Sequence, residues 1–147
     1  MTHGISIGRE AAISVVINGV LSLAFFLGVF GTQSRWLYWT GPDELALDFV
    51  PQSMAVALMS ALVPALIARR RLGKQLALHP ILIRAALFAL AGAILGGLLA
   101  FAISQAGLPP IDWANALAIK IAYGGALGAL VASLALRRLL SSAKSFA

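Results

Sequence analysis

Long apolar stretches alternate with short polar segments along the whole chain. Four stretches of about 20 residues each have the length needed to cross about 30 Å of hydrocarbon. They cover residues 11–31, 49–68, 81–104 and 113–136. The segments between them are too short to form a soluble domain with its own core. The pattern predicts an all-α integral membrane protein, one domain of residues 1–147 with four transmembrane helices in two antiparallel hairpins.

Composition agrees with this pattern and narrows the possible functions. Of the 147 residues, 61% are hydrophobic and only 11% are charged, whereas soluble domains have about 25% charged residues. The absence of cysteine excludes disulfides, thiolate metal sites and cysteine nucleophiles. The sequence also has no phosphate-binding loop, zinc motif or nucleophile elbow. We therefore expect a non-enzymatic protein without a cofactor or a metal.

Basic residues gather at one set of helix ends and give the chain a formal charge of +6. This distribution predicts, by the positive-inside rule, that both termini and the connection 69–80 are cytoplasmic and that residues 32–47 are external. We expect a multi-pass protein of a bacterial inner membrane. Nucleic acid is not an expected partner, because the charges lie at helix ends rather than along a face. The residues at these ends are Arg9, Arg69, Arg70, Arg71, Lys74, Arg84, Arg137, Arg138 and Lys144.

The densest part of this charge is the cluster Arg69, Arg70, Arg71 and Lys74. It is first a determinant of topology. The same side chains can also attract anionic lipid headgroups, at about 1 kcal/mol each. The expected partners are therefore the lipid bilayer and, as a second possibility, its anionic lipids.

Aromatic residues mark the opposite boundary. Trp36, Tyr38, Trp39 and Trp113 all fall where the helices are expected to leave the membrane on the outer side. Amphipathic rings prefer this depth. We expect an anchoring belt, with an aromatic ligand site as the alternative.

Small residues recur every four positions in the third and fourth stretches. Gly92 and Gly96 belong to one such row, and Gly124 and Gly128 to another. Glycine allows helix backbones to approach closely within a membrane. The linker between the two stretches is short, so we expect the third and fourth helices to be the closest pair, in contact around Gly96 and Gly124. The rows serve either packing within one chain or packing between copies in a homo-oligomer.

Three polar residues interrupt the apolar stretches: Asn18, Gln52 and Lys120. A lysine at the centre of a membrane helix costs about 2.5 to 3.5 kcal/mol, so it needs a partner. Asp48 lies four residues before Gln52 and therefore on the same helical face. We expect Lys120 to be buried, neutralised mainly by Asp48 and adjacent to Gln52. The alternatives are a lysine that faces lipid and a substrate or ion site.

Asn18 lies between Ser14 and Ser22, four residues from each, which forms a narrow polar stripe. The stripe serves helix packing or a polar pathway. The sequence as a whole favours a small accessory or assembly subunit, or a self-associating helical bundle. The alternative is a small oligomeric transporter or channel whose polar path involves Asn18, Gln52 and Lys120. A third hypothesis is a lipid-binding protein that uses the basic cluster.

Overall fold

The computed structural model describes residues 7–71 and 77–144. The described part is all-helical apart from two short strands, and its four helices are long and apolar enough to cross a membrane. The four apolar stretches are thus confirmed as helices. The helices are α1 (Ile7–Phe30), α2 (Phe49–Arg71), α3 (Leu78–Gln105) and α4 (Trp113–Lys144), and the strands are β1 (Trp36–Leu37) and β2 (Ile111–Asp112).

The helices extend beyond the apolar stretches mainly at the basic end of the bundle. The most extended, α4, continues eight residues past position 136, to Lys144. Hydropathy marks only the apolar part of a helix, whereas Arg, Lys and Leu all favour continued helical hydrogen bonding. At the other end, Gly31 and Gly107 follow α1 and α3 with φ angles of 72° and 60°, in the left-handed region where glycine is favoured.

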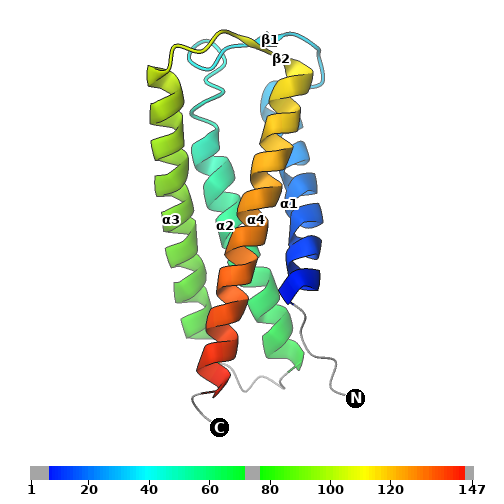
Figure 1. Cartoon of the computed structure of the whole chain (residues 1–147), viewed down its shortest axis with the longest axis vertical. Coiled ribbons are helices and arrows are strands. Elements are labelled where there is room, and N and C mark those ends of the chain that lie inside the picture. Colours follow the sequence, from blue (N-terminus) through cyan, green and yellow to red (C-terminus); the bar gives the residue numbers. More distant parts are fainter. Residues whose placement is uncertain (1–6, 72–76, 145–147) are drawn as a thin grey trace.

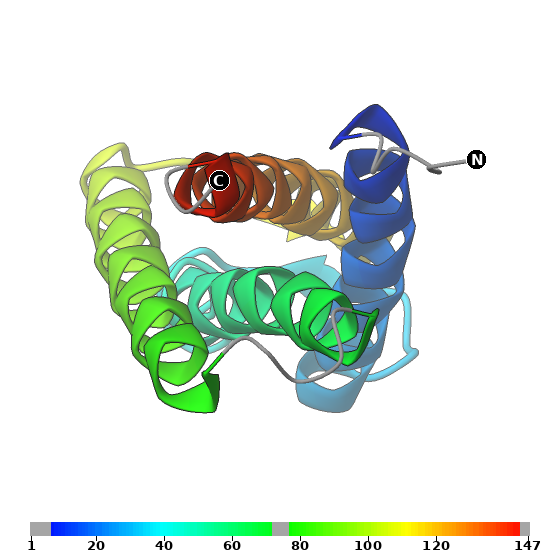
Figure 2. The same ribbon diagram turned by 90° about the horizontal axis from the view of Figure 1, so that it is seen from below.

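The four helices alternate in direction, with α2 and α4 at the centre of the bundle (Figures 1 and 2). The closest pairs are α2 with α3 and α1 with α4, and α2 also packs against α4. In the described part of the chain, α3 and α4 make little direct contact. The prediction that they form the closest pair is wrong, and the two sequential hairpins are not the packing units.

The reason lies in the segment that joins α3 to α4. Its strand β2 pairs antiparallel with β1, which follows α1, and Trp36 lies opposite Asp112 in the ribbon. This pairing holds the first turn of α4 beside the end of α1 rather than beside the end of α3 (Figure 1). Asp112 then caps α4, because its Oδ1 accepts hydrogen bonds from the backbone N–H groups of Ala114 and Asn115, both at 3.1 Å.

Glycines allow α2 to approach α3 closely and α1 to approach α4 closely. They do not mediate the expected contact between α3 and α4. A Cβ atom on Gly92 would lie 2.5 Å from the backbone oxygen of Ser53 on α2, and a Cβ on Gly96 would overlap the backbone of Phe49. On α4, a Cβ on Gly124 or Gly128 would overlap side chains of α1. All four glycines therefore lie at contacts within one chain.

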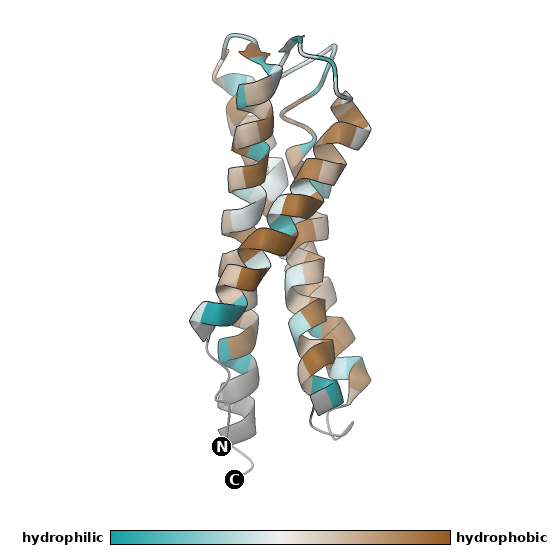
Figure 3. Ribbon diagram, turned by 90° about the vertical axis from the view of Figure 1, so that its right-hand side faces the viewer, coloured by the Kyte–Doolittle hydropathy of each residue, from teal (hydrophilic) through white to brown (hydrophobic). Residues whose placement is uncertain are grey.

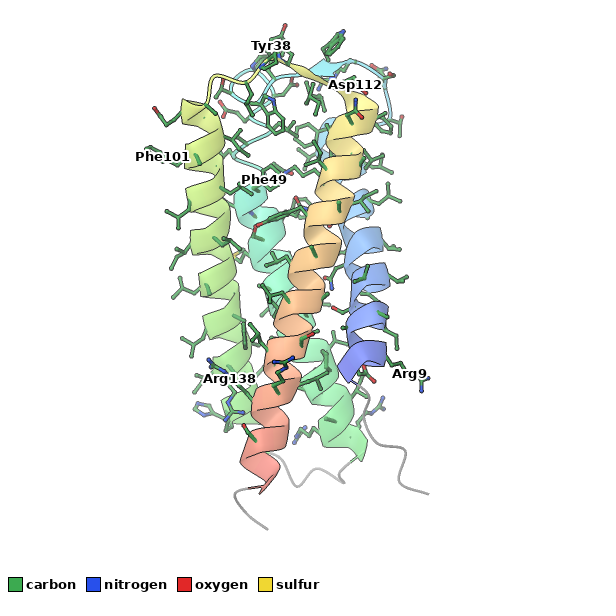
Figure 4. The ribbon with its side chains drawn as sticks, viewed as in Figure 1. Arg9, Tyr38, Phe49, Phe101, Asp112 and Arg138 are labelled. Atoms are coloured by element: carbon green, nitrogen blue, oxygen red, sulfur yellow. The ribbon has the colours of Figure 1, made fainter. Side chains whose placement is uncertain are left out.

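Residues 31–48 and 106–112 form a structured cap over one end of the bundle. The indole N–H of Trp39 donates to the Pro109 carbonyl, and that of Trp113 donates to the Gly31 carbonyl, both at 3.0 Å. Both rings are partly buried; Trp39 ties the two segments of the cap together, and Trp113 ties the cap to α4. The anchoring belt stays a prediction. Trp36 and Tyr38 are exposed, and Tyr38 lies at the tip of the cap (Figure 4).

An ion pair stabilises the cap internally. Arg35 Nη1 lies 2.6 Å from Asp43 Oδ1, and the backbone N–H of Tyr38 donates to Asp43 Oδ2 at 3.0 Å. Burial alone would raise the pKa of Asp43, but these two bonds hold it below its ordinary value. The pKa of Asp112 is also lowered, chiefly by the backbone N–H of Asn115.

The ends of the bundle differ in charge. Arg9 and Arg138 lie at the end that carries both termini, which we call the basic end, and Asp112 lies at the cap (Figure 4). Hydrophobic residues dominate the helices between the two ends (Figure 3). Of the basic cluster, Arg69 and Arg70 lie at the basic end of α2, whereas Lys74 and the side chain of Arg71 lie outside the described residues.

Candidate functional site

Seven polar side chains are buried in the described part of the chain, and we call the six of them other than Ser53 the polar core, which runs through the bundle between α1, α2 and α4. Each is at most 7% exposed. Those of α1 recur every four residues and therefore face the same side of the helix. Those of α2 and α4 meet that face from the other side. The members are Ser14, Asn18 and Ser22 of α1, Gln52 and Ser60 of α2, and Lys120 of α4.

Lys120 is paired at the end of the polar core nearest the cap. Its Nζ lies 2.8 Å from Asp48 Oδ2 and 3.6 Å from the centre of the Phe49 ring, and the residue is 2% exposed. Asp48 occupies this position because the cap leads directly into α2 there. Figure 4 shows Phe49 at the start of the same helix. The predicted pair between Lys120 and Asp48 is confirmed, and a lysine that faces lipid is excluded by its burial.

Gln52 connects three helices next to this pair. Its Nε2 donates to Ser22 Oγ on α1 at 3.0 Å and to the backbone oxygen of Lys120 on α4 at 2.9 Å. Gln52 is thus a neighbour of Lys120 as expected, although it contacts the lysine backbone rather than the ammonium group. Its other amide atom, Oε1, is buried and accepts no hydrogen bond from the described residues.

Asn18 makes the corresponding connection nearer the basic end. Its Nδ2 lies 2.9 Å from Ser60 Oγ on α2, 2.8 Å from the Ser14 carbonyl oxygen and 3.0 Å from Ser14 Oγ. These contacts tie α1 to α2 at about the middle of α1. The Oδ1 atom of Asn18 is buried, and no group in the described part of the chain donates to it.

Sequence reasoning missed a second polar contact, between α2 and α4. Ser53 Oγ lies 2.6 Å from the Tyr123 hydroxyl and donates to the Phe49 carbonyl at 2.5 Å. The Tyr123 and Phe49 rings meet edge to face, with centroids 4.9 Å apart. Helical spacing could have indicated this group, because Tyr123 lies three residues after Lys120 and Ser53 lies four residues after Phe49.

Two crevices open between α1 and α2, which pack less closely than α2 with α3, α1 with α4, or α2 with α4. The larger has a volume of about 60 Å³ and is lined by Asn18 together with Ser14, Ser60 and Glu10. It does not reach Lys120. The narrower crevice is lined by Gln52 and Ser22 and has no space for a water molecule. The polar core is therefore continuous as a set of residues but not as a cavity.

The chemistry available in this core is hydrogen bonding and one ion pair. Within residues 7–71 and 77–144, no group of three or more His, Asp or Glu side chains could hold a metal ion. No protein-family model, curated protein or solved structure matches the chain. The site must therefore be interpreted from its own geometry.

Proposed function

We propose that the chain is a small non-enzymatic integral membrane protein of a bacterial inner membrane, where it serves as an accessory or assembly subunit or as a self-associating bundle. The observation that carries this proposal is the internal pairing of Lys120 with Asp48, away from the α1–α2 crevices. A lysine whose side chain is 2% exposed and already paired is suited to holding helices together.

The surface supports the same proposal. Large apolar side chains are exposed along the helices, and Phe101 of α3 points away from the bundle (Figure 4). Surfaces of this kind are suited to lipid or to other membrane helices. The basic end, together with both termini, would lie in the cytoplasm, as the positive-inside rule requires. The cap would lie on the outer side of the membrane. Arg69 and Arg70 would then lie at the height of anionic lipid headgroups.

The second candidate is an oligomeric transporter or channel with Asn18, Gln52 and Lys120 along its path. The two unpaired amide oxygens favour it, because a permeating ion or water could supply the missing partners. Such a path would need a conformation or an assembly in which the crevice at Asn18 extends to Lys120.

Native mass spectrometry of the protein, extracted from its own membrane in a mild detergent, separates the two. The proposal expects a stoichiometric assembly, and the same protein in liposomes should show no ion flux above that of Lys120→Met. A lone monomer in the native extract would overturn the subunit proposal. A flux that Lys120→Met abolishes without loss of thermal stability would favour the transporter.

A further inference from the structure

A charged side chain without a partner lies inside the apolar part of α3. Of the 28 residues of this helix, all of them described, only Arg84 is an Asp, Glu, Lys or Arg. It lies six residues past Leu78, where α3 begins, or about 9 Å along the helix axis. Within the described part of the chain it makes no hydrogen bond and no ion pair. A charge inside a membrane helix is costly unless it is paired, so Arg84 needs a counter-charge from outside the fold.

The acidic side chains of the chain itself do not supply this counter-charge. Four of the five belong to the cap, at the opposite end of the bundle. The fifth, Glu10, lies on α1, which is on the opposite side of the bundle from α3 (Figure 2). A second copy of the chain is a poor source as well. Its Glu10 is half-buried beside the α1–α2 crevice, and the rest of its basic end is positive.

Arg84 lines a crevice at the point where α2, α3 and α4 meet. The crevice has a volume of about 20 Å³, far below the roughly 300 to 1,000 Å³ of pockets that enclose a small molecule. A space of this size accepts only a short part of a flexible chain that lies along the bundle. The other lining residues are all apolar: Ala61 and Ala65 of α2, Ile81 and Phe88 of α3, and Ala135 of α4.

A second arginine stands on the α4 side of this crevice. Arg138 lies three residues after Ala135 and therefore on the same face of α4, about 4.5 Å nearer the basic end (Figure 4). Side chains of an α-helix lean toward its N-terminus. Because α3 begins at the basic end and α4 ends there (Figure 1), Arg84 leans toward the basic end and Arg138 leans back from it. The two guanidinium groups are thus brought toward the same height.

We infer that this crevice binds an anionic phospholipid, with the headgroup phosphate between Arg84 and Arg138 and one acyl chain against the apolar walls. Positive charge at the basic end and apolar walls deeper in the bundle follow the order of headgroup and hydrocarbon in a phospholipid. Basic pockets between transmembrane helices are known to bind such headgroups. The site is separate from the cluster of residues 69–74, which follows α2.

A carboxylate on the helix of another protein is the competing counter-charge. It would have to be buried beside Arg84 and would lose its hydration there. A lipid phosphate stays in the headgroup layer, which a long arginine side chain reaches by extending along the helix. The lipid is therefore the better match. This inference rests on the membrane location in the proposed function but not on the role as a subunit.

Native mass spectrometry of lipid binding tests the chemistry. The full-length protein is freed of lipid in detergent and titrated with phosphatidylglycerol or with phosphatidylcholine, whose headgroup has a phosphate but no net charge. We expect one phosphatidylglycerol to bind in preference to phosphatidylcholine. Arg84→Gln should weaken this binding about five-fold. The control Arg70→Gln, at an exposed position at the same end of the bundle, should weaken it much less.

Two results of this titration would overturn the inference. Equal losses in Arg84→Gln and Arg70→Gln would show a general attraction to the basic end rather than a site. Equal binding of the two lipids would show that charge does not select the ligand. Because Arg84 is exposed and makes no bond within the described residues, Arg84→Gln should unfold at the same temperature as the unchanged protein in lipid-free detergent. Earlier unfolding would show a structural role for Arg84 and would also contradict the inference.

A photoactivatable phosphatidylglycerol with its reactive group in an acyl chain tests the location. In liposomes, labelling at the half-buried Phe88 should fall in Arg84→Gln. Labelling at Val20, which is exposed on α1 and meets bulk lipid, should not change. Labelling of Phe88 that is independent of Arg84 would contradict the proposed position of the lipid.

The outcome for the proposed function is separate. A protein that shows no lipid preference but still forms a stoichiometric assembly would contradict the lipid site and leave the subunit proposal intact. A chain that does not insert into liposomes would contradict both.

Discussion

The contacts α2–α3 and α1–α4 both use two glycines one helical turn apart, yet they differ in what lies over the glycines. Gly92 and Gly96 of α3 face the backbone of α2. Gly124 and Gly128 of α4 face the side chains of Ser22 and Asn18 on α1. The first contact is a close approach of two backbones. The second leaves space for polar side chains, and those side chains reach on to α2.

This difference shows how one kind of sequence signal produces two kinds of interface. Backbone approach gains dispersion energy along a helix but selects its partner only by shape. The polar side chains on α1 make specific bonds to α2, Ser22 with Gln52 and Asn18 with Ser60, and so fix how α1 lies against α2. Gln52 in turn donates to the Lys120 carbonyl of α4. We interpret α2–α3 as a shape-determined contact and α1–α4 as a contact whose alignment is set by the polar bonds that each of these helices makes with α2.

The largest effect is expected at the ion pair of Lys120 and Asp48, at the end of the polar core nearest the cap. Lys120→Met or Asp48→Asn should each lower the free energy of unfolding by about 3 to 5 kcal/mol, because each leaves one buried charge without its partner. Thermal unfolding of the purified protein in detergent measures this. A control at the exposed Ile119, next to Lys120 on α4, should change stability little when replaced by Leu. Full stability in both charge variants would contradict the buried pair.

The next effect concerns the shape-determined contact. Gly96→Ala should cost about 1 to 3 kcal/mol, because its Cβ would overlap the backbone of Phe49 and Val50, which cannot move aside alone. Gly97→Ala is the matched control, since a Cβ there meets nothing within 4 Å. Equal stabilities of the two variants, measured by the same thermal unfolding, would show that α3 does not approach α2 as described.

A second substitution that restores stability distinguishes the α1–α4 contact from the α2–α3 contact. Gly124→Ala should also destabilise the protein, by about 1 to 2 kcal/mol, because its Cβ would overlap Ser22 Oγ. Here the obstacle is a side chain, so the added change Ser22→Ala should restore part of the loss. The readout is the unfolding temperature of both single variants and the double variant. A double variant that loses more stability than the two single variants lose together would contradict the placement of the Ser22 side chain in this contact.

The smallest effect is expected in the cap, outside both interfaces. The folded pKa of Asp43 lies below its ordinary value, which is about 3.9. At pH values above that ordinary pKa, the ionised carboxylate therefore stabilises the cap. Its contribution to stability disappears as the pH falls through the lower folded pKa. Acid titration should shift the emission of the three tryptophans, all in or next to the cap. Asp43→Asn should reduce the shift, and an emission unchanged between pH 6 and pH 2 would contradict this role.

The sequence predicted the helices well because length and hydropathy alone determine which segments can cross a membrane. The pair Lys120–Asp48 was also predictable. A buried lysine needs an opposite charge, and Asp48 is one of few acidic residues at the same height. Helical periodicity placed Gln52 beside that pair, because Gln52 lies four residues after Asp48.

The helix partners were not predictable from the same pattern. A row such as Gly92 and Gly96 indicates that some backbone approaches, but it does not identify which one. The deciding element is the ribbon of β1 and β2, two residues in each strand, which is too short to show an alternating pattern. The hydrogen bonds of Trp39 and Trp113 were not predictable for a related reason, because an indole N–H bonds equally well to a loop carbonyl or to a lipid headgroup.

The central claim is that the buried polar residues hold the helices together, and the coupling between Asp48 and Lys120 tests it most directly. The measurement is a double-mutant cycle of Asp48→Asn and Lys120→Met on the free energy of unfolding. Removing both members of a buried pair leaves no uncompensated charge, so the double variant should lose much less stability than the sum of the two single losses. Losses that simply add would show that the two residues are not coupled and would contradict the account.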